Sequence, residues 1–293
     1  MRYPRKWQLA VVCLLALALV PFAPAPRGTA QAPGYTVTDL GTLGGNAGER
    51  SRAFGLDECG KVVGESQAVA GASAPSRPFL WSNGVMTDLG TLGGQSGTAY
   101  AVNQGGAVAG AAQTAGGSRH AFFRPEAGPT PQDLGTLGGP TAEAYDINAS
   151  GQVVGVSEEN GGIQDRAFVW QPGVGMRGLK TSGCAPSVTC AEWGTPIRAF
   201  GINDAGQIAG TANHNVSGTH AFVTVGGVAL DLGTLGGAVS FATEVNDSGE
   251  VSGYSYIFSD TIAQSFHAFR WKDADGDGVS DPGEMQDLGT LGG

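Results

Sequence analysis

Short apolar segments separated by glycine-rich turns dominate the chain after residue 34. In one such segment His267, Phe269 and Trp271 are spaced by two, so their side chains share one face of an extended strand, with Ala268 on the opposite face. No apolar pattern with a helical period and capping residues occurs in this part of the sequence. The pattern therefore predicts an all-β protein.

The predicted strands are organised by a repeated heptapeptide, Asp-Leu-Gly-Thr-Leu-Gly-Gly. Two further blocks accompany most copies: a turn that opens with Asn and leads into an apolar pair followed by Gly, and a basic-Ala-Phe block followed by an aromatic residue. The identical copies of the heptapeptide are Asp39–Gly45, Asp88–Gly94, Asp133–Gly139, Asp231–Gly237 and Asp287–Gly293. Identity over seven residues in five places cannot arise by chance, so the sequence is a repeat array.

The period of the array indicates its architecture. The Phe of the third block recurs in steps of 43, 46, 54 and 47 residues, at Phe79, Phe122, Phe168, Phe222 and Phe269. Each step contains four strand-like pieces, which predicts a β-propeller-like array of four-stranded repeats. An irregular β-solenoid, favoured by the 50 glycines, is the alternative. We expect one domain, 39–293, made of units at 39–87, 88–132, 133–177, 178–230 and 231–286, with a partial repeat at 287–293.

The N-terminus has the features of a secretory signal peptide. Basic residues precede an apolar stretch, Leu9–Val20, and Gly28-Thr29-Ala30 offers a small-residue cleavage site. We expect residues 1–30 to be removed near Ala30; an uncleaved signal anchor is the alternative. The apolar stretch is too short to span a bilayer as a helix, and the mature chain contains no transmembrane segment. Residues 31–38 are expected to form a linker and the start of a strand at Tyr35–Leu40.

Charge and cysteine content bear on the candidate partners and on the cellular location. The net charge is −10, and the mature region contains no run of Lys or Arg, so nucleic acid and anionic membranes are poor candidate partners. Export leads to a secreted or cell-surface location in an oxidising compartment. Cys184 and Cys190 are spaced to close a short disulfide loop, whereas Cys59 stands at a turn position and is interpreted as a tolerated surface residue.

One segment, Asp273–Glu284, matches the twelve-residue calcium-loop pattern. In this pattern three aspartates provide carboxylate ligands and the seventh residue provides its backbone carbonyl. The ninth residue binds directly or through water, and the twelfth provides a bidentate carboxylate. The expected ligands of Ca²⁺ are Asp273, Asp275, Asp277, Val279, Asp281 and Glu284. The flanking segments have strand patterns, which predicts a structural calcium loop within a hairpin rather than an EF-hand. A solvated acidic turn is the alternative.

Two other sets of residues have both a functional and a structural interpretation. The basic position two residues before the Phe of each repeat holds Arg77, His120, Arg166, His220 and His267. Exchange of His for Arg argues against metal ligation, so a donor that bonds a neighbouring turn is expected. Trp81, Trp170 and Trp271 are suited to a sugar-binding surface, but their phase with Phe places them in the core. The sequence contains neither Gly-x-Ser-x-Gly nor His-Glu-x-x-His.

Together the three blocks resemble the HAF family of probable extracellular repeats. The resemblance covers Asp39–Gly293, with departures at Arg77-Pro78-Phe79 and at unit four, which lacks its opening heptapeptide. It implies an extracellular location and no reaction, substrate or catalytic residue.

Three hypotheses follow for the function. The first is a secreted or cell-surface, non-catalytic binding scaffold with a calcium-binding loop, whose candidate partners are an extracellular glycan or protein. The second is a secreted carbohydrate-active enzyme, a hydrolase or lyase, with paired carboxylates at one mouth of the propeller. The third is a passive envelope or matrix component. A structure without converging acids would remove the second hypothesis.

Overall fold

The computed structural model describes residues 36–291, except 46–47, 70, 72–73, 160–163, 180–192, 215–217 and 259–264. These residues form twenty strands and no helix, so the all-β prediction is confirmed, and no membrane-spanning helix occurs among them. Contacts divide the chain into Met1–Asp39 and Leu40–Gly293, and the second unit holds every strand. The strand expected at Tyr35–Leu40 is not formed over its described part, because no described strand pairs with it.

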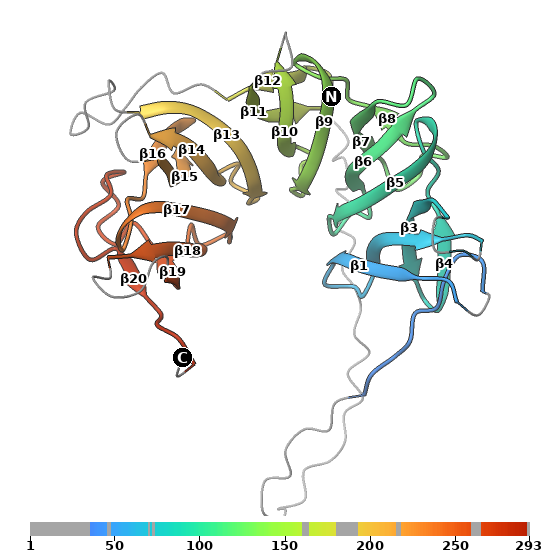
Figure 1. The fold of residues 1–293 in the computed structure, drawn as a ribbon, viewed down its shortest axis with the longest axis horizontal. Helices are drawn as coiled ribbons and strands as arrows, with labels where there is room; N and C mark the ends of the chain where they lie inside the picture. The colour runs from blue at the N-terminus through green and yellow to red at the C-terminus, as the bar shows by residue number, and fades with distance from the viewer. Residues whose placement is uncertain are drawn as a thin grey trace, which may run out of the picture. The chain divides into compact units, whose positions relative to one another are not determined.

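The strands make five four-stranded antiparallel sheets, called blades 1 to 5, in which neighbours in sequence are neighbours in the sheet (Figure 1). Blade 1 contains β1 (Ser51–Leu56), β2 (Val62–Gln67), β3 (Ser76–Ser82) and β4 (Val85–Asp88). Blade 2 contains β5 (Gly93–Val102), β6 (Val108–Thr114), β7 (Arg119–Arg124) and β8 (Gln132–Asp133). Blade 3 contains β9 (Gly138–Ile147), β10 (Val153–Glu159), β11 (Asp165–Gln171) and β12 (Gly175–Gly178). Blade 4 contains β13 (Trp193–Ile202), β14 (Ile208–His214), β15 (Gly218–Val225) and β16 (Val228–Asp231). Blade 5 contains β17 (Gly236–Val245), β18 (Val251–Ile257), β19 (Phe266–Trp271) and β20 (Met285–Asp287).

Successive blades stack on one another in chain order. Strand β7 contacts β9, β11 contacts β13, and β15 contacts β17. Figure 1 shows the five blades following one another round an arc, with an open side between blades 1 and 5. The heptapeptide makes the corner between blades: Asp88 ends β4, Leu89 is buried, and Gly93 begins β5. The β-propeller-like prediction is confirmed.

A cross-strand pair of Phe and Gly forms the centre of each blade. Phe122 has 0% exposure and lies opposite Gly110, where an added Cβ would stand 2.8 Å from Phe122 Cε1 and 2.2 Å from the Thr98 carbonyl oxygen. Only Gly fits beneath the ring, which explains the Gly that follows each apolar pair. The pairs are Gly64–Phe79, Gly110–Phe122, Gly155–Phe168, Gly210–Phe222 and Gly253–Phe269.

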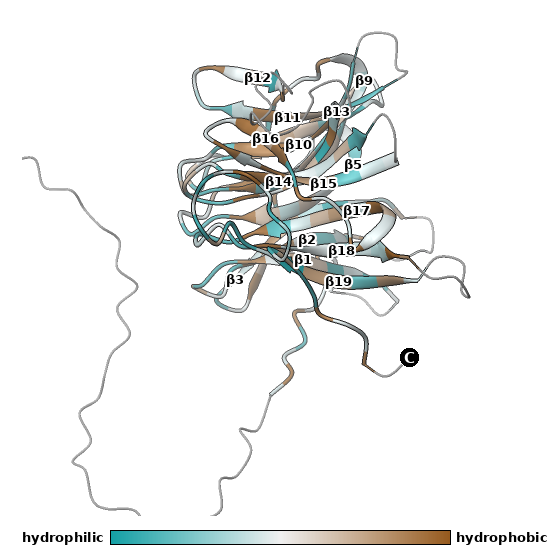
Figure 2. Ribbon diagram, turned by 90° about the vertical axis from the view of Figure 1, so that its left-hand side faces the viewer, coloured by the Kyte–Doolittle hydropathy of each residue, from teal (hydrophilic) through white to brown (hydrophobic). Residues whose placement is uncertain are grey.

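The hydrophobic core follows the predicted strand faces. In Figure 2 hydrophobic stretches lie in strands such as β14 and β15. Trp170 and Trp271 are buried in these cores, as expected from their phase with Phe, whereas Trp81 is only partly buried. Core packing rather than sugar binding accounts for the first two.

The interpretation of Cys59 as an unpaired surface residue is wrong. Its side chain is in a disulfide, and the partner lies outside the described residues. Cys184 and Cys190 also lie outside them, so their predicted pairing stays a prediction. Sequence spacing favours local pairs and gives no signal for a link to a distant segment.

Candidate functional site

The acidic loop Asp273–Glu284 connects β19 to β20, which pair through Trp271 and Met285. Asp273, Asp275 and Asp277 each offer one carboxylate oxygen, and these oxygens lie within 4.8 Å of one another. The loop is thus part of a strand hairpin, as the flanking patterns predict. Of the expected ligands, the structure brings these three together.

Hydrogen bonds within the loop hold its carboxylates in place. The Asp273 carboxylate accepts from Gly276 N (2.7 Å) and from Gly278 N (3.1 Å), and both glycines have positive φ. Glu284 Oε1 accepts from Ala274 N at 2.7 Å, and Glu284 Oε2 accepts from Asp281 N at 2.9 Å. Glu284 therefore spans the two ends of the loop, although its carboxylate and that of Asp281 are not in the converging group.

In blades 1, 2, 4 and 5 the basic residue two positions before the Phe pairs with the Asp that opens the heptapeptide. The distances are 2.6 Å for Arg77–Asp88, 3.0 Å for His120–Asp133, 2.9 Å for His220–Asp231 and 2.8 Å for His267–Asp287. The same carboxylates accept from the Gly two residues later, which fixes the corner between blades. In blade 3 Gly178 replaces the Asp, and Arg166 Nε lies 3.2 Å from Glu159 Oε1 instead. The structural interpretation of this position is confirmed.

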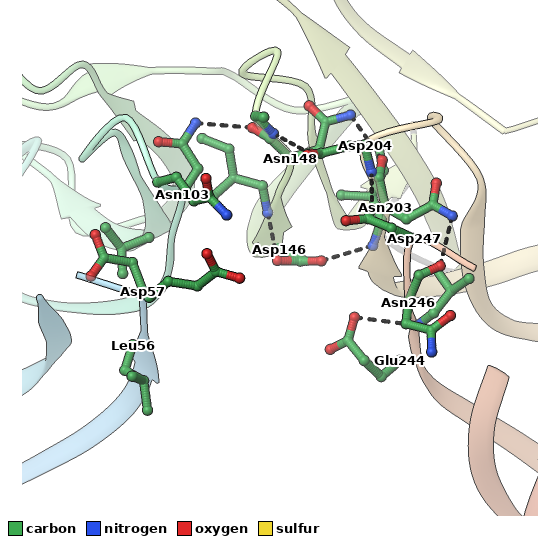
Figure 3. Close-up of a pocket in the computed structure, with 17 residues that line it drawn as sticks. Leu56, Asp57, Asn103, Asp146, Asn148, Asn203, Asp204, Glu244, Asn246 and Asp247 are labelled. Atoms are coloured by element: carbon green, nitrogen blue, oxygen red, sulfur yellow. Dashed lines mark hydrogen bonds between the residues drawn. The ribbon is translucent and has the colours of Figure 1, made fainter. Parts of the chain in front are cut away.

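The turns that open with Asn gather on one side of the blades, here called the Asn-turn face (Figure 3). Each Asn Oδ1 accepts from the backbone N four residues later, at 2.9 Å for Asn103 and 3.0 Å for Asn148. In three of the turns Nδ2 also donates to the carbonyl of the corresponding residue in the next blade, whereas Asn246 Nδ2 donates to Glu250 Oε2 at 3.2 Å. The bonds between blades are Asn103 to Asn148 (2.9 Å), Asn148 to Asn203 (3.1 Å) and Asn203 to Asn246 (2.9 Å). One side chain thus caps its own turn and joins two blades.

A cavity of about 430 Å³ opens on the Asn-turn face and receives residues from all five blades (Figure 3). No Lys, Arg or His is among the described residues that line it. Its carboxylates are Asp57, Glu58, Asp146, Asp204, Glu244 and Asp247. The charge of this lining disfavours anions in the cavity.

Two of these carboxyls have raised pKa values. Burial raises the pKa of Asp146, whose two oxygens accept from Ile147 N and Ile202 N at 2.7 Å each, and the charge of Asp204 adds to the rise. Loss of water contact, followed by the charge of Asp146, raises the pKa of Glu244 to about 7, although part of the side chain remains exposed. Near neutral pH the Glu244 carboxyl can therefore hold a proton. Both carboxyls line the same cavity, so the enzyme hypothesis is not removed.

Sequence reasoning missed Asp146 and Glu244. Each stands two residues before a turn Asn, at a place where other repeats have Gly55, Ala101 and Gly201. A comparison of the repeats at that single position would have shown two acids among small residues. Asp146 and Glu244 line the same cavity because blades 3 and 5 both face it, and no sequence pattern predicts how the blades face.

A row of aromatic rings crosses the first strands of blades 1 to 4. The ring centroids of Phe54 and Tyr100 are 5.5 Å apart, those of Tyr100 and Tyr145 5.7 Å, and those of Tyr145 and Phe200 5.4 Å. Tyr145 also lines a smaller hollow of about 220 Å³ with Arg119, Glu143, Asp165 and Arg198 among its other walls. Aromatic faces beside planar charged groups are suited to polyhydroxyl ligands.

Comparison with known proteins shows the fold alone. No family model and no curated protein matches the chain. Among solved structures, TolB from Acinetobacter baumannii aligns with a TM-score of 0.50 and 12% identity, covering 76% of this chain and 52% of TolB. The chain thus spans about half the length of TolB.

Two further solved structures are similar to the chain. An arginine-to-alanine mutant of AofleA from Arthrobotrys oligospora has a TM-score of 0.40 and 14% identity, covering 87% of this chain and 76% of that one. A putative gluconolactonase has a TM-score of 0.35 and 11% identity, covering 65% and 69%. The described residues thus form a β-propeller-like array of five four-stranded blades.

Proposed function

We propose that the protein is a secreted or cell-surface binding scaffold, without catalytic activity, stabilised by calcium in the loop Asp273–Glu284. The observation that carries the proposal is the convergence of the Asp273, Asp275 and Asp277 oxygens within 4.8 Å. Unscreened carboxylates at such separations repel one another, and a hard cation that takes oxygen ligands relieves the repulsion. Glu284 already reaches across the loop, so small rotations would add its oxygens to the ion.

Two features support export. Residues 1–30 have the charged, apolar and small-residue regions of a signal peptide. The disulfide at Cys59 fits an oxidising compartment, where such bonds persist. The resemblance to HAF repeats agrees with this location.

The proposed ligand surface is the acidic cavity of the Asn-turn face together with the aromatic row. Their carboxylates, amides and rings provide hydrogen-bond acceptors and apolar faces of the kind that bind an extracellular glycan or a polar protein segment. Rigid strands of five blades support these groups, which limits the ordering cost of binding.

The calcium test is thermal unfolding of the purified protein in calcium and then in excess chelator. Calcium at about a hundred times its dissociation constant should add roughly 2.7 kcal/mol to the unfolding free energy. The Asp277→Ala variant should lose this rise, whereas Glu126→Gln, which changes an exposed carboxylate outside the loop, should keep it. Absence of a shift in the wild type, with calorimetry also silent, would show that the loop is a solvated acidic turn.

The second candidate function is a carbohydrate-active hydrolase or lyase, and the Asp146–Glu244 arrangement favours it specifically. A carboxyl whose pKa lies near neutrality can act as the general acid of such chemistry, together with a second carboxyl in the same site. We expect no turnover in a panel of polysaccharide substrates. Turnover that Glu244→Gln or Asp146→Asn abolishes would refute the scaffold proposal, whereas glycan-array binding without turnover would separate it from a passive structural role.

A further inference from the structure

A second cluster of metal-ligand side chains lies in blade 4, away from the acidic loop. His214 ends β14, His220 lies in β15 and Asp231 ends β16. One ligand atom from each lies within 4.8 Å of the others. Asp231 Oδ2 is 2.9 Å from His220 Nδ1 and 4.0 Å from His214 Nε2. The side chains are 12%, 11% and 14% exposed in the order His214, His220, Asp231, so the group is shielded but open to a small ion.

The repeated structure accounts for only two of these three residues. His220 and Asp231 form the corner pair that His120–Asp133 and His267–Asp287 form in blades 2 and 5. At the place of His214, blade 2 has Thr114 and blade 5 has Ile257. Within the described residues, blade 4 alone adds an imidazole to the pair. The corner does not need this third side chain.

We propose that His214, His220 and Asp231 bind a divalent transition metal, with Zn²⁺ as the best match. Two imidazoles and a carboxylate are ligands that zinc accepts, at about 2.0–2.2 Å each. In a tetrahedral site such ligand atoms stand about 3.3 Å apart. The separations of 2.9 and 4.0 Å lie on either side of that value, so the spacing of Asp231 from the two imidazoles is compatible with a shared ion. The fourth position is left to water.

The histidine rings define the one rearrangement that the ion requires. Their centroids are 4.2 Å apart and their planes differ by 13°, so the in-plane nitrogen lone pairs run nearly parallel. One ring must turn about its Cβ–Cγ bond to aim at a shared ion, and this torsion has a broad energy profile in His. An ion bound at His220 Nδ1 would replace the proton that this nitrogen shares with the Asp231 carboxylate.

The two proposed metal sites select different ions. The blade 4 site offers imidazole nitrogen, which suits zinc, whereas the loop Asp273–Glu284 offers only hard oxygen ligands, which suit calcium. Asp231 Oδ1 also accepts from Gly233 N at 2.7 Å, a bond that orients the carboxylate as ligands in metal sites are commonly oriented. Calcium in excess should therefore leave the blade 4 site available to zinc.

The test is calorimetric titration of untagged protein with Zn²⁺ in saturating calcium, together with the visible absorption of Co²⁺ added in place of zinc. We expect one equivalent, weakened at least tenfold by His214→Thr, which installs the blade 2 residue. Equal zinc binding by wild type and His214→Thr, or no binding by the wild type, would overturn the proposal.

A gain-of-site variant keeps the proposal testable if His214→Thr fails to fold. Thr114 and His120 are six positions apart, as are His214 and His220, so Thr114→His recreates the cluster beside the His120–Asp133 pair. A second zinc equivalent in this variant supports the proposal. A folded Thr114→His protein, by circular dichroism, that binds no more zinc than the wild type counts against it. Because calcium is measured separately, failure here leaves the calcium loop unaffected.

Discussion

Asp57 occupies the place of the turn Asn in blade 1, but it has no Nδ2 with which to join its blade to the next. Its Oδ1 accepts from Cys59 N at 3.0 Å and Lys61 N at 2.7 Å, the same capping role that Asn103 fills in blade 2. Asp57 is 5% exposed, and its Oδ2 is buried without a partner. In Asn103, Asn148 and Asn203 the atom at the place of this Oδ2 is Nδ2, which donates to a carbonyl of the next blade. We therefore predict that Asp57→Asn stabilises the protein.

The magnitude follows from the two changes that the substitution makes. It adds a hydrogen bond to the Asn103 carbonyl, worth about 0.5–1.5 kcal/mol net, and it removes a buried unsatisfied oxygen, which costs about 1–3 kcal/mol. Allowing for imperfect geometry, we expect a gain of about 2 kcal/mol in the free energy of unfolding. For a chain of this size that corresponds to a rise of about 4–8 °C in Tm.

The assay is denaturant unfolding with calcium present and without reductant, so that the Cys59 disulfide stays intact. Asn148→Asp is the matched opposite, because it replaces the donor to the Asn203 carbonyl with a carboxylate oxygen. It should lower stability by about 2–3 kcal/mol. Peptide-level hydrogen exchange should place the gain of Asp57→Asn at the interface between blades 1 and 2, since repeat arrays respond locally.

A specific pair of results would refute this reasoning. If Asp57→Asn left the denaturation midpoint unchanged or lowered it, while Asn148→Asp lowered it as expected, the Asp57 Oδ2 would have to be satisfied by another group, such as bound water. The bridge between turns would then contribute to stability only where Asn already stands.

Two further predictions concern the core and the cavity. Gly155→Ala should lower the free energy of unfolding by at least about 3 kcal/mol, because the added Cβ would stand 1.9 Å from the Glu143 carbonyl oxygen. Gly116→Ala is the control, since its added Cβ would have its nearest neighbour at 3.7 Å, and it should change the denaturation midpoint little. Similar losses of stability in both variants would contradict the steric explanation. The pKa of Glu244 is raised to about 7 in the folded protein, so its contribution to stability is full below the ordinary carboxyl pKa and is lost as pH rises towards 7. Glu244→Gln should reduce this pH-dependent loss of unfolding free energy between pH 4.5 and 8, by less than about 1 kcal/mol because the residue is partly exposed. An equal dependence of stability on pH in the wild type and in the variant would contradict the raised pKa of Glu244.

Local and repeated features were accessible from the sequence. Strand alternation, the turns that open with Asn and the Phe of each repeat sufficed for an all-β array of four-stranded units, because each signal lies within one blade. The acidic loop was found in the same way, since its converging aspartates Asp273, Asp275 and Asp277 lie within five residues. The basic position was expected to bond a turn, but its partner, the Asp of the heptapeptide, became evident only in the structure.

The contacts that join blades were decided by the tertiary structure. Asn148 and Asn203 are 55 residues apart, and Asp146 and Glu244 come from blades 3 and 5, yet stacking brings both pairs to one face. The strand predicted at Tyr35–Leu40 failed for the complementary reason, since a strand needs a neighbour that no local pattern supplies. The sequence specifies which side chains each blade carries in its turns and strands. Which side chains meet depends on the angle and order in which rigid blades stack, and that is set by packing between blades.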